Sequence, residues 1–413
     1  MILVSYSLLT HNNMSKIFLF ICRMIVGFTF IFSGFTKAVD PMGFAIKIED
    51  YLIAFQMDWF SPVALPFAIF MIAIEFLFGF YLVIGFHVRI VAPLILILMS
   101  AMTLLTLYSA VFNPVSDCGC FGDAVKITNW QTFWKNVVLM IFTVGLFYLR
   151  KQYNNSSDNS IFKILCAIAG VAYIIILTFY SYNNLPIMDF RPYKIGTHIA
   201  SGMTIPDDAE QPEYETIFIM ERNGEKKTFT IDDYPYEDST WVFVDSETKI
   251  IREGFTPPLQ EFSLIDPEFG DVTGSVINHR GTSFLMIAPH LDKAKGSIKQ
   301  FAELSNAAKQ KNIPFYCVTA SDVGGVTDFD YLQSDETLLK TIIRSNPGLV
   351  MLYDGVVVGK WHFNNLPDKE IVNNPLSYTL NQSIEKNKQL VSWVNILLLI
   401  AFTAILINRK NKK

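Results

Sequence analysis

The chain has 413 residues, of which 51% are hydrophobic and only 17% are charged. A soluble protein usually carries about a quarter charged residues, so this composition indicates a membrane protein with a soluble part. The net charge of −5 argues against a nucleic-acid partner, because nucleic-acid-binding proteins usually present a basic face. Five cysteines in a chain of this length exclude a scaffold held together by disulfide bonds.

Six apolar runs are long enough to cross a membrane, since a spanning helix needs roughly 20 mostly apolar residues. They cover residues 17–35, 62–84, 90–112, 130–149, 162–182 and 390–407. We interpret the first run as a retained span, because it is too long for a signal peptide and no small-residue cleavage site follows it. Met14 offers an alternative start, so residues 1–15 are set aside as an N-terminal extension.

Positive residues beside these runs predict the orientation of the chain, because cytoplasmic loops are rich in lysine and arginine. The markers are Lys16, Arg89, Arg150, Lys151, Lys163 and the tail residues Arg409, Lys410, Lys412 and Lys413. They fit six spans in a bacterial inner membrane with both termini in the cytoplasm. The loop around Cys118 and residues 183–389 then lie in the oxidising periplasm.

Arg23 and Glu75 lie inside the first and second runs, where an isolated charge is expensive and usually has a partner. At ~1.5 Å per residue their depths differ by about 5 Å, so we expect an ion pair between them. Two roles fit such a pair. It could be a purely structural link, or it could form a polar pocket for a proton step or for a quinone, the one cofactor that we consider.

Residues 183–254 are predicted to form a small β-rich subdomain outside the membrane. Asn223-Gly224 separates two alternating strand patterns, which is a strong signal for a β-hairpin. The run TWVFVDSETKII, residues 240–251, predicts a second pair of strands with a polar turn between them.

Residues 255–388 follow a different pattern, which predicts an α/β domain with a mixed sheet. The expected elements are buried strands at 281–288 and 313–322, helices within 292–312 and at 335–345, and a hairpin turning at Asp354-Gly355. Asp335 or Ser334 is the expected N-cap of the second helix, since both side chains can accept a hydrogen bond from the first turn.

This order of elements resembles the redoxin branch of the thioredoxin fold, with Pro347 in the place of the family's cis-proline. The resemblance puts the family's Cys-x-x-Cys motif within residues 288–296, which contain no cysteine and have His290 at the first reactive position. Cys317 lies in the middle of a predicted strand, so we expect it to be a buried apolar residue. The domain cannot form its own dithiol, which favours a partner-binding or structural role over catalysis.

A second resemblance covers residues 16–150. The segments CRMIVGFTFIFSGFTKAVDP, IEFLFGFYLVIG and DCGCFGDAVK are similar to those of the DoxX/MauE group of four-helix membrane proteins. A fifth span within 151–182, the outer domain, and a sixth span with a basic tail in 389–413 complete an arrangement similar to DoxX-family proteins of Bacteroidetes. The MauE branch is associated with maturation of a disulfide-rich periplasmic enzyme and other relatives with quinone-linked sulfur oxidation. The resemblance therefore implies thiol chemistry.

Cys118 and Cys120 form the only close thiol pair in the sequence. A disulfide between positions i and i+2 would be strained, and strained, exposed disulfides are typically labile, catalytic or regulatory. Lys37, at the outer end of the first span, would favour a thiolate, whereas Asp117 and Asp123 would oppose it or shuttle protons. The pair could also be a structural turn that pins two spans, or it could hold a soft metal ion, although no further ligand lies nearby in the sequence.

Two functions stay open at this point. The first is a membrane thiol–disulfide oxidoreductase, in which the thiol pair, Lys37 and Asp123 act on a periplasmic protein thiol while Arg23 and Glu75 bind quinone. The second is non-enzymatic: a membrane-anchored assembly or envelope-maintenance factor that binds protein partners through residues 183–389. The Cys-Gly-Cys loop favours the first function, and the missing Cys-x-x-Cys motif favours the second.

Overall fold

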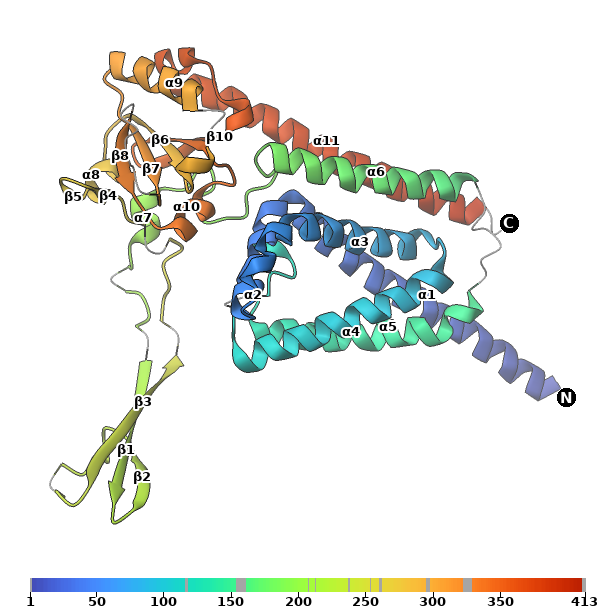
Figure 1. The fold of residues 1–413 in the computed structure, drawn as a ribbon. Coiled ribbons are helices and arrows are strands. Elements are labelled where there is room, and N and C mark those ends of the chain that lie inside the picture. Colours follow the sequence, from blue (N-terminus) through green and yellow to red (C-terminus); the bar gives the residue numbers. More distant parts are fainter. Residues whose placement is uncertain are drawn as a thin grey trace.

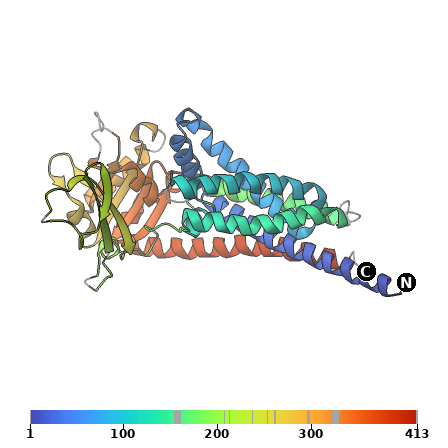
Figure 2. The same ribbon diagram turned by 90° about the horizontal axis from the view of Figure 1, so that it is seen from below.

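The computed structural model describes residues 2–115, 118–153, 161–206, 208–211, 213–236, 238–252, 254–259, 262–294, 298–321 and 329–410. Figure 1 shows a helical bundle, an α/β domain at one end of it, and a three-stranded sheet that projects from the α/β domain. Both ends of the chain lie at the opposite end of the bundle from the α/β domain (Figures 1 and 2). Asp117, Lys412 and Lys413, which the sequence predictions used, are outside the described residues.

Five helices in the described part of the chain are long and apolar enough to cross a membrane. They are α1 (Ile2–Val39), α3 (Ala64–Ile84), α4 (Val88–Phe112), α5 (Asn129–Leu149) and α6 (Ile161–Asn183). These helices contain the first five predicted runs, and α1 extends back through the predicted N-terminal extension as far as Ile2.

The sixth predicted run lies in α11 (Pro375–Lys410), which runs beside α6 in both ribbon views (Figures 1 and 2). The Trp393 ring of α11 lies 5.9 Å from the Tyr173 ring of α6. The stretch Lys388–Leu399 of α11 is an apolar helix, and it covers only part of the predicted run at 390–407. The sixth crossing therefore stays a prediction.

Helices α1 and α3 pack closely because glycines face each other between them. A Cβ atom on Gly34 would lie 2.7 Å from the backbone nitrogen of Phe76, and one on Gly79 would lie 2.6 Å from the carbonyl oxygen of Gly27. Such distances leave room only for hydrogen, so glycine is what lets the two backbones approach. This packing sets which side chains of α1 and α3 meet in the middle of the bundle.

A short helix that the sequence analysis did not predict, α2 (Pro41–Ala54), connects α1 to α3 through a 3₁₀ turn, η1 (Asp58–Val63). Asp40 is its N-cap and accepts a 2.8 Å hydrogen bond from the Gly43 amide, while Pro41 occupies the first helical position. Both residue types are favoured at these positions. Helix α2 lies at the end of the bundle near the α/β domain, next to the Cys-Gly-Cys loop.

The α/β domain is built on a mixed seven-stranded sheet with the order β10-β9-β6-β7-β8-β4-β5. Its strands are β4 (Ile265–Asp266), β5 (Gly270–Asp271), β6 (Thr282–Ala288), β7 (Phe315–Thr319), β8 (Asp330–Gln333), β9 (Gly348–Tyr353) and β10 (Val356–His362). Strands β6, β7 and β8 are parallel, and β9 and β10 are antiparallel to their neighbours. The predicted mixed sheet and the hairpin at Asp354-Gly355 are confirmed.

Helices cover both faces of this sheet, because successive residues of its central strands point to opposite sides. The helices are α7 (Ile199–Met203), α8 (Thr273–Ile277), α9 (Ile298–Gln310) and α10 (Glu336–Ile342). Leu285 of β6 packs in the cluster with α10, and Phe284 packs in the cluster with α9. Asp335 caps α10 through a 2.9 Å bond from the Leu338 amide, as predicted.

Two further predictions for this domain are confirmed. Cys317 is fully buried in β7, where desolvation raises the pKa of its thiol to about 12. The peptide bond between Asn346 and Pro347 is cis. The thioredoxin-like character of the domain itself stays a prediction.

The small sheet consists of β1 (Glu213–Arg222), β2 (Glu225–Phe229) and β3 (Val242–Arg252). The predicted hairpin at Asn223-Gly224 joins β1 to β2, and both turn residues have positive φ angles, as a two-residue hairpin turn requires. The predicted strand pair within residues 240–251 is wrong. The polar residues there continue one strand, because β3 pairs with β1 over nearly the full length of β1.

Candidate functional site

The Cys-Gly-Cys loop lies between α4 and α5, at the end of the bundle where the α/β domain lies (Figure 1). Asn129 holds the two ends of the loop together: its Nδ2 donates to Asn113 Oδ1 and to the Val115 carbonyl oxygen, each at 2.8 Å. Thr128 caps α5 in a capping box with Gln131. The loop therefore starts and ends at fixed points.

Cys118 and Cys120 are both unbridged, and their sulfur atoms lie 3.1 Å apart. Cys118 is buried and Cys120 is half-buried. Gly119 between them has a φ of +64°, a conformation that L side chains rarely adopt. A Cβ atom there would also lie 3.1 Å from Cγ of Lys47 on α2. Glycine at this position is what lets the two thiols face each other.

Lys37 and Glu75 form a buried ion pair below the loop. Lys37 Nζ lies 2.8 Å from each carboxylate oxygen of Glu75. Ser33 Oγ lies 2.8 Å from Glu75 Oε2 and 2.8 Å from the carbonyl oxygen of Cys120, and its one proton can be donated to either acceptor. Ser33 thus connects the ion pair to the backbone of the thiol turn.

The predicted ion pair between Arg23 and Glu75 is wrong. Arg23 donates to the carbonyl oxygen of Leu82 at 3.0 and 2.7 Å and lies over the Tyr153 ring, 4.7 Å from its centroid. The last carbonyl groups of a helix attract a cation, and Leu82 is near the end of α3. Leu82 is two turns, about 10 Å, from Glu75 along α3. The two residues predicted to bind a cofactor are therefore not brought together.

The two thiols differ in acidity because of their surroundings. A hydrogen bond from the Cys118 thiol lowers the pKa of Cys120 below its ordinary value; burial opposes this effect, and Lys135 and Lys37 add to it. The same hydrogen bond and burial raise the pKa of Cys118. The lowered pKa favours Cys120 as the thiolate of the pair, with the Cys118 thiol as its hydrogen-bond donor.

An apolar cavity of about 210 Å³ borders both sulfur atoms. It lies between the loop, α1, α2, α3 and α4. Its walls are Lys37, Phe44, Lys47, Ile48, Tyr51, Leu52, Phe55, Phe67, Met71, Met102, Leu105, Cys118 and Cys120. Apolar walls with a few polar groups are typical of sites for small ligands. The aromatic side chains suit a flat apolar molecule, and the two lysines could meet its polar atoms.

Asp123 points toward the α/β domain. Its Oδ2 lies 3.0 Å from Nη2 of Arg344, and Nε of the same guanidinium lies 2.9 Å from Asp40 Oδ2. The carboxylate predicted to shuttle protons for the thiols is thus engaged in an ion pair. A catalytic role for Asp123 stays a prediction.

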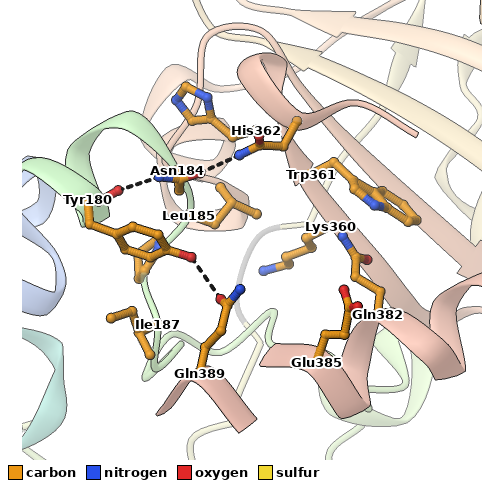
Figure 3. Close-up of a pocket in the computed structure, with 12 residues that line it drawn as sticks. Tyr180, Asn184, Leu185, Ile187, Lys360, Trp361, His362, Gln382, Glu385 and Gln389 are labelled. Atoms are coloured by element: carbon orange, nitrogen blue, oxygen red, sulfur yellow. Dashed lines mark hydrogen bonds between the residues drawn. The ribbon is translucent and has the colours of Figure 1, made fainter. Parts of the chain in front are cut away.

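A second, more polar hollow of about 380 Å³ lies where α6, β10 and α11 meet (Figure 3). Tyr180 of α6 donates to Gln389 Oε1 of α11 at 2.8 Å across this hollow, and Lys360 and His362 of β10 form another wall. None of the predicted site residues lines it. Among the described residues, no group of three or more His, Cys, Asp or Glu side chains could hold a metal ion.

Sequence analysis missed several residues of the site. These are Ser33, Lys47, Tyr51, Lys135 and Arg344. For Lys47 and Tyr51 a signal was present, because Asp40-Pro41 is a typical helix start and predicts α2. Ser33 lies one turn before Lys37 on α1, so a search for polar residues on that helix face would have found it.

Comparison with known proteins identifies the membrane part. Residues 15–149 match the family model of the methylamine utilisation protein MauE, and residues 214–253 match a domain of unknown function (DUF8463). Protein TlpB of Flavobacterium psychrophilum is 24% identical over 141 residues, which are 33% of this chain and 38% of that protein. The chain thus spans well under half the length of this relative, and no solved structure matches. Residues 15–149, which contain the thiol pair and the Lys37–Glu75 ion pair, are a MauE family domain of a multi-pass membrane protein.

Proposed function

We propose that Cys118 and Cys120 are the redox-active dithiol of a membrane thiol–disulfide oxidoreductase. The observation that carries this proposal is the pair itself: two sulfur atoms 3.1 Å apart, in residues that line an apolar cavity. The lowered pKa of Cys120 supports it. A purely structural turn would need neither a polarised pair of thiols nor an adjoining cavity. The similarity to MauE and TlpB supports thiol chemistry in a membrane in general terms.

The two sulfurs have different roles. In the disulfide form, a thiolate of a periplasmic protein substrate attacks the more accessible Cys120, and Cys118 leaves and takes up a proton. The second substrate thiol then attacks the substrate sulfur of this mixed disulfide, and Cys120 leaves as the stabilised thiolate. A thiol with a low pKa is the better leaving group, so the second step is favoured. The substrate gains one disulfide, and the pair gains two electrons.

Restoring the disulfide needs a two-electron oxidant, and a quinone bound in the apolar cavity would supply that chemistry. Cys118 and Cys120 would give up two electrons and two protons to it as their S–S bond forms. Lys37 and Lys47 lie in the wall of the cavity, where an ammonium group can donate to a quinone oxygen. We therefore propose that the cofactor site is formed by α2 and the loop. Arg23, predicted to bind it, takes no part; Glu75 contributes by holding Lys37.

We assign the periplasmic side to the loop and to residues 183–389, with both termini in the cytoplasm of a bacterial inner-membrane protein. The α/β domain and the thiol loop lie at one end of the bundle, and both chain ends lie at the other, which supports this orientation (Figures 1 and 2). A soluble protein substrate can reach the loop only from that side.

The test uses the full chain with Cys22, Cys166 and Cys317 replaced by alanine, so that only the pair can be labelled. These three cysteines are buried among apolar residues. The protein in lipid nanodiscs is incubated with decylubiquinone, quenched with acid and labelled with a polyethylene glycol maleimide. We expect both labels to be lost with quinone and regained when a reduced, unfolded protein is added.

Two controls make this result decisive. A C118S/C120S variant should leave the added protein reduced, and nanodiscs without quinone should complete a single turnover only. If the labels never change, or if C118S/C120S oxidises the substrate as well as the parent does, the proposal fails. The non-enzymatic role as an assembly factor then becomes the better explanation.

A further inference from the structure

We propose that Arg344 is a positioning residue through which the α/β domain holds the turn of Cys118 and Cys120 in its reactive geometry. This inference rests on the proposed function for its purpose, but its test measures the thiols directly. It assigns a task to a domain that has no thiol pair of its own.

The contact is built around one guanidinium group. Arg344 lies in the loop between α10 and β9, three positions before Pro347. Its Nε lies 2.9 Å from Asp40 Oδ2, its Nη2 lies 3.0 Å from Asp123 Oδ2, and its Nη1 donates to the Lys340 carbonyl oxygen at 2.7 Å. Every nitrogen of the guanidinium is thus engaged, and two of them reach the membrane domain.

Asp123 connects this contact to the thiol turn. It belongs to the 3₁₀ turn η2 (Gly122–Ala124), which begins two residues after Cys120. The Gly122 amide donates to the Gly119 carbonyl oxygen at 3.0 Å and closes the chain around Cys120. A change in the position of Asp123 therefore also changes the position of Cys120, because one short turn connects them.

Asp40 connects the same guanidinium to the other side of the pair. Its second oxygen caps α2 through Gly43, and α2 carries Tyr51. The Tyr51 hydroxyl lies 3.0 Å from Ser109 Oγ, and Tyr51 lines the same cavity as Cys118. Arg344 therefore joins the two elements that flank the thiols, the loop and α2.

The ion pairs are shielded from water, which makes them effective. The side chains of Arg344, Asp40 and Asp123 are only 11%, 13% and 26% exposed. Exposed ion pairs contribute little, whereas loss of one partner of a shielded pair leaves an uncompensated charge. Arginine also fits because its planar fork can hold two carboxylates at once, which the single ammonium of lysine does less well.

Other charges lie on the same two faces. Glu49 of α2 is attracted to Lys340 of α10 and to Lys293 of the turn after β6, and it is repelled by Glu336 of α10. Lys126, just after η2, borders a hollow that Thr341 of α10 also lines. These charges lie around the contact made by Arg344, whose side chain is only 11% exposed.

The test measures the alkylation rate of Cys120 by iodoacetamide as a function of pH. It uses the full chain in nanodiscs, with the three apolar cysteines replaced by alanine. The variants are R344Q, D123N, their combination and R344K. The matched control is R222Q, because Arg222 forms an exposed pair with Asp238 in the small sheet, away from the thiols.

A positioning role predicts that R344Q loosens the turn and weakens the hydrogen bond between the thiols. The midpoint of the pH–rate profile should then move up toward that of an ordinary thiol, and the rate at neutral pH should change about threefold or more, as for contacting residues. D123N should act in the same way, the combination should add little, and R344K should be intermediate. R222Q should match the parent.

Two results would overturn the inference: profiles of R344Q and R222Q that coincide, or effects of R344Q and D123N that simply add. If R344Q does not fold, D123N and R344K decide between these outcomes. The readout needs only reduced thiols. The thiol pair could fail to turn over with quinone while R344Q still shifts the pH–rate profile. That result would refute the proposed function but not the positioning role of Arg344.

Discussion

Lys37 and Glu75 join α1 to α3 by an ion pair whose side chains are only 4% and 7% exposed. Removing one partner of such a pair strands a charge inside the bundle and costs about 3–5 kcal/mol. We expect E75Q and K37M each to lower the free energy of unfolding by this order, measured by denaturant titration in detergent. The double change K37M/E75L should cost less than either single change, because no charge is left unpaired.

The control for this prediction is K309M. Lys309 and Asp330 form a pair 3.7 Å apart whose side chains are 48% and 65% exposed, so its loss should change the free energy of unfolding by less than about 1 kcal/mol. Equal effects of K309M and K37M would contradict a stabilising role of the buried pair.

The polarised thiol pair makes a second prediction. Because the Cys118 thiol donates to Cys120, the thiolate of Cys120 persists as the pH falls below the ordinary pKa of a cysteine. C118A removes the donor, so the midpoint of the alkylation profile of Cys120 should rise. C118S keeps a hydroxyl donor and should lie between C118A and the parent. A profile of C118A that matches the parent would show that the lysines alone set the acidity.

A third prediction concerns His362 at the end of β10. Burial lowers the pKa of its imidazole to about 4, and its Nδ1 accepts a hydrogen bond from the Asn364 amide at 3.2 Å. Between pH 6.5 and 4 the unfolded state binds a proton that the folded state does not, so stability falls as the pH falls. The loss should reach about 3 kcal/mol at pH 4.

Hydrogen exchange of the β9–β10 amides in the full chain measures this loss. H362N keeps an acceptor near the position of Nδ1 but does not titrate, so its protection should be independent of pH in this window. Asp189 does not interfere. Burial opposes its ionisation, yet Arg191 and Lys360 hold its pKa well below the ordinary 3.8, so its contribution is lost only at lower pH. If the amides of H362N lost protection between pH 6.5 and 4 as those of the parent do, the role of His362 would be contradicted.

Much of the fold could be predicted because its signals are local. Apolar runs predicted the five helices, alternation predicted β1 and β2, and Asn223-Gly224 predicted the turn between them. The prediction for residues 240–251 failed because polar residues in an exposed strand look like a turn when the partner strand is unknown. Pairing with β1 decides that β3 continues through them.

The candidate site was only partly predictable because its contacts are not local. The loop, Lys37 and Glu75 carry signals in their own residue types. No local signal shows that Lys37 is the partner of Glu75. This pairing depends on how the glycines of α1 and α3 set the packing of the two helices. Arg344 meets Asp123 across 221 positions of sequence, and no pattern around either residue indicates the other.

The glycine packing itself makes the last prediction. A Cβ atom on Gly34 would lie 2.7–2.9 Å from the backbone nitrogen and Cα of Phe76, which cannot move aside as a flexible side chain could. G34A should therefore push α1 and α3 apart next to Glu75 and destabilise the bundle by about 1–3 kcal/mol. A methyl group added to Gly274 in α8 would have no neighbouring atom within 4 Å, so G274A should be neutral or stabilising by about 1 kcal/mol.

Denaturant titration of G34A and G274A, with the alkylation rate of Cys120 as a local reporter, tests this prediction. Because this packing holds Glu75 of α3 against Ser33 and Lys37 of α1, and Ser33 also bonds the Cys120 carbonyl, G34A should slow alkylation at neutral pH, whereas G274A should not. If G34A is as stable as G274A and reacts as the parent does, the close approach of the helices is not what holds the ion pair below the thiols.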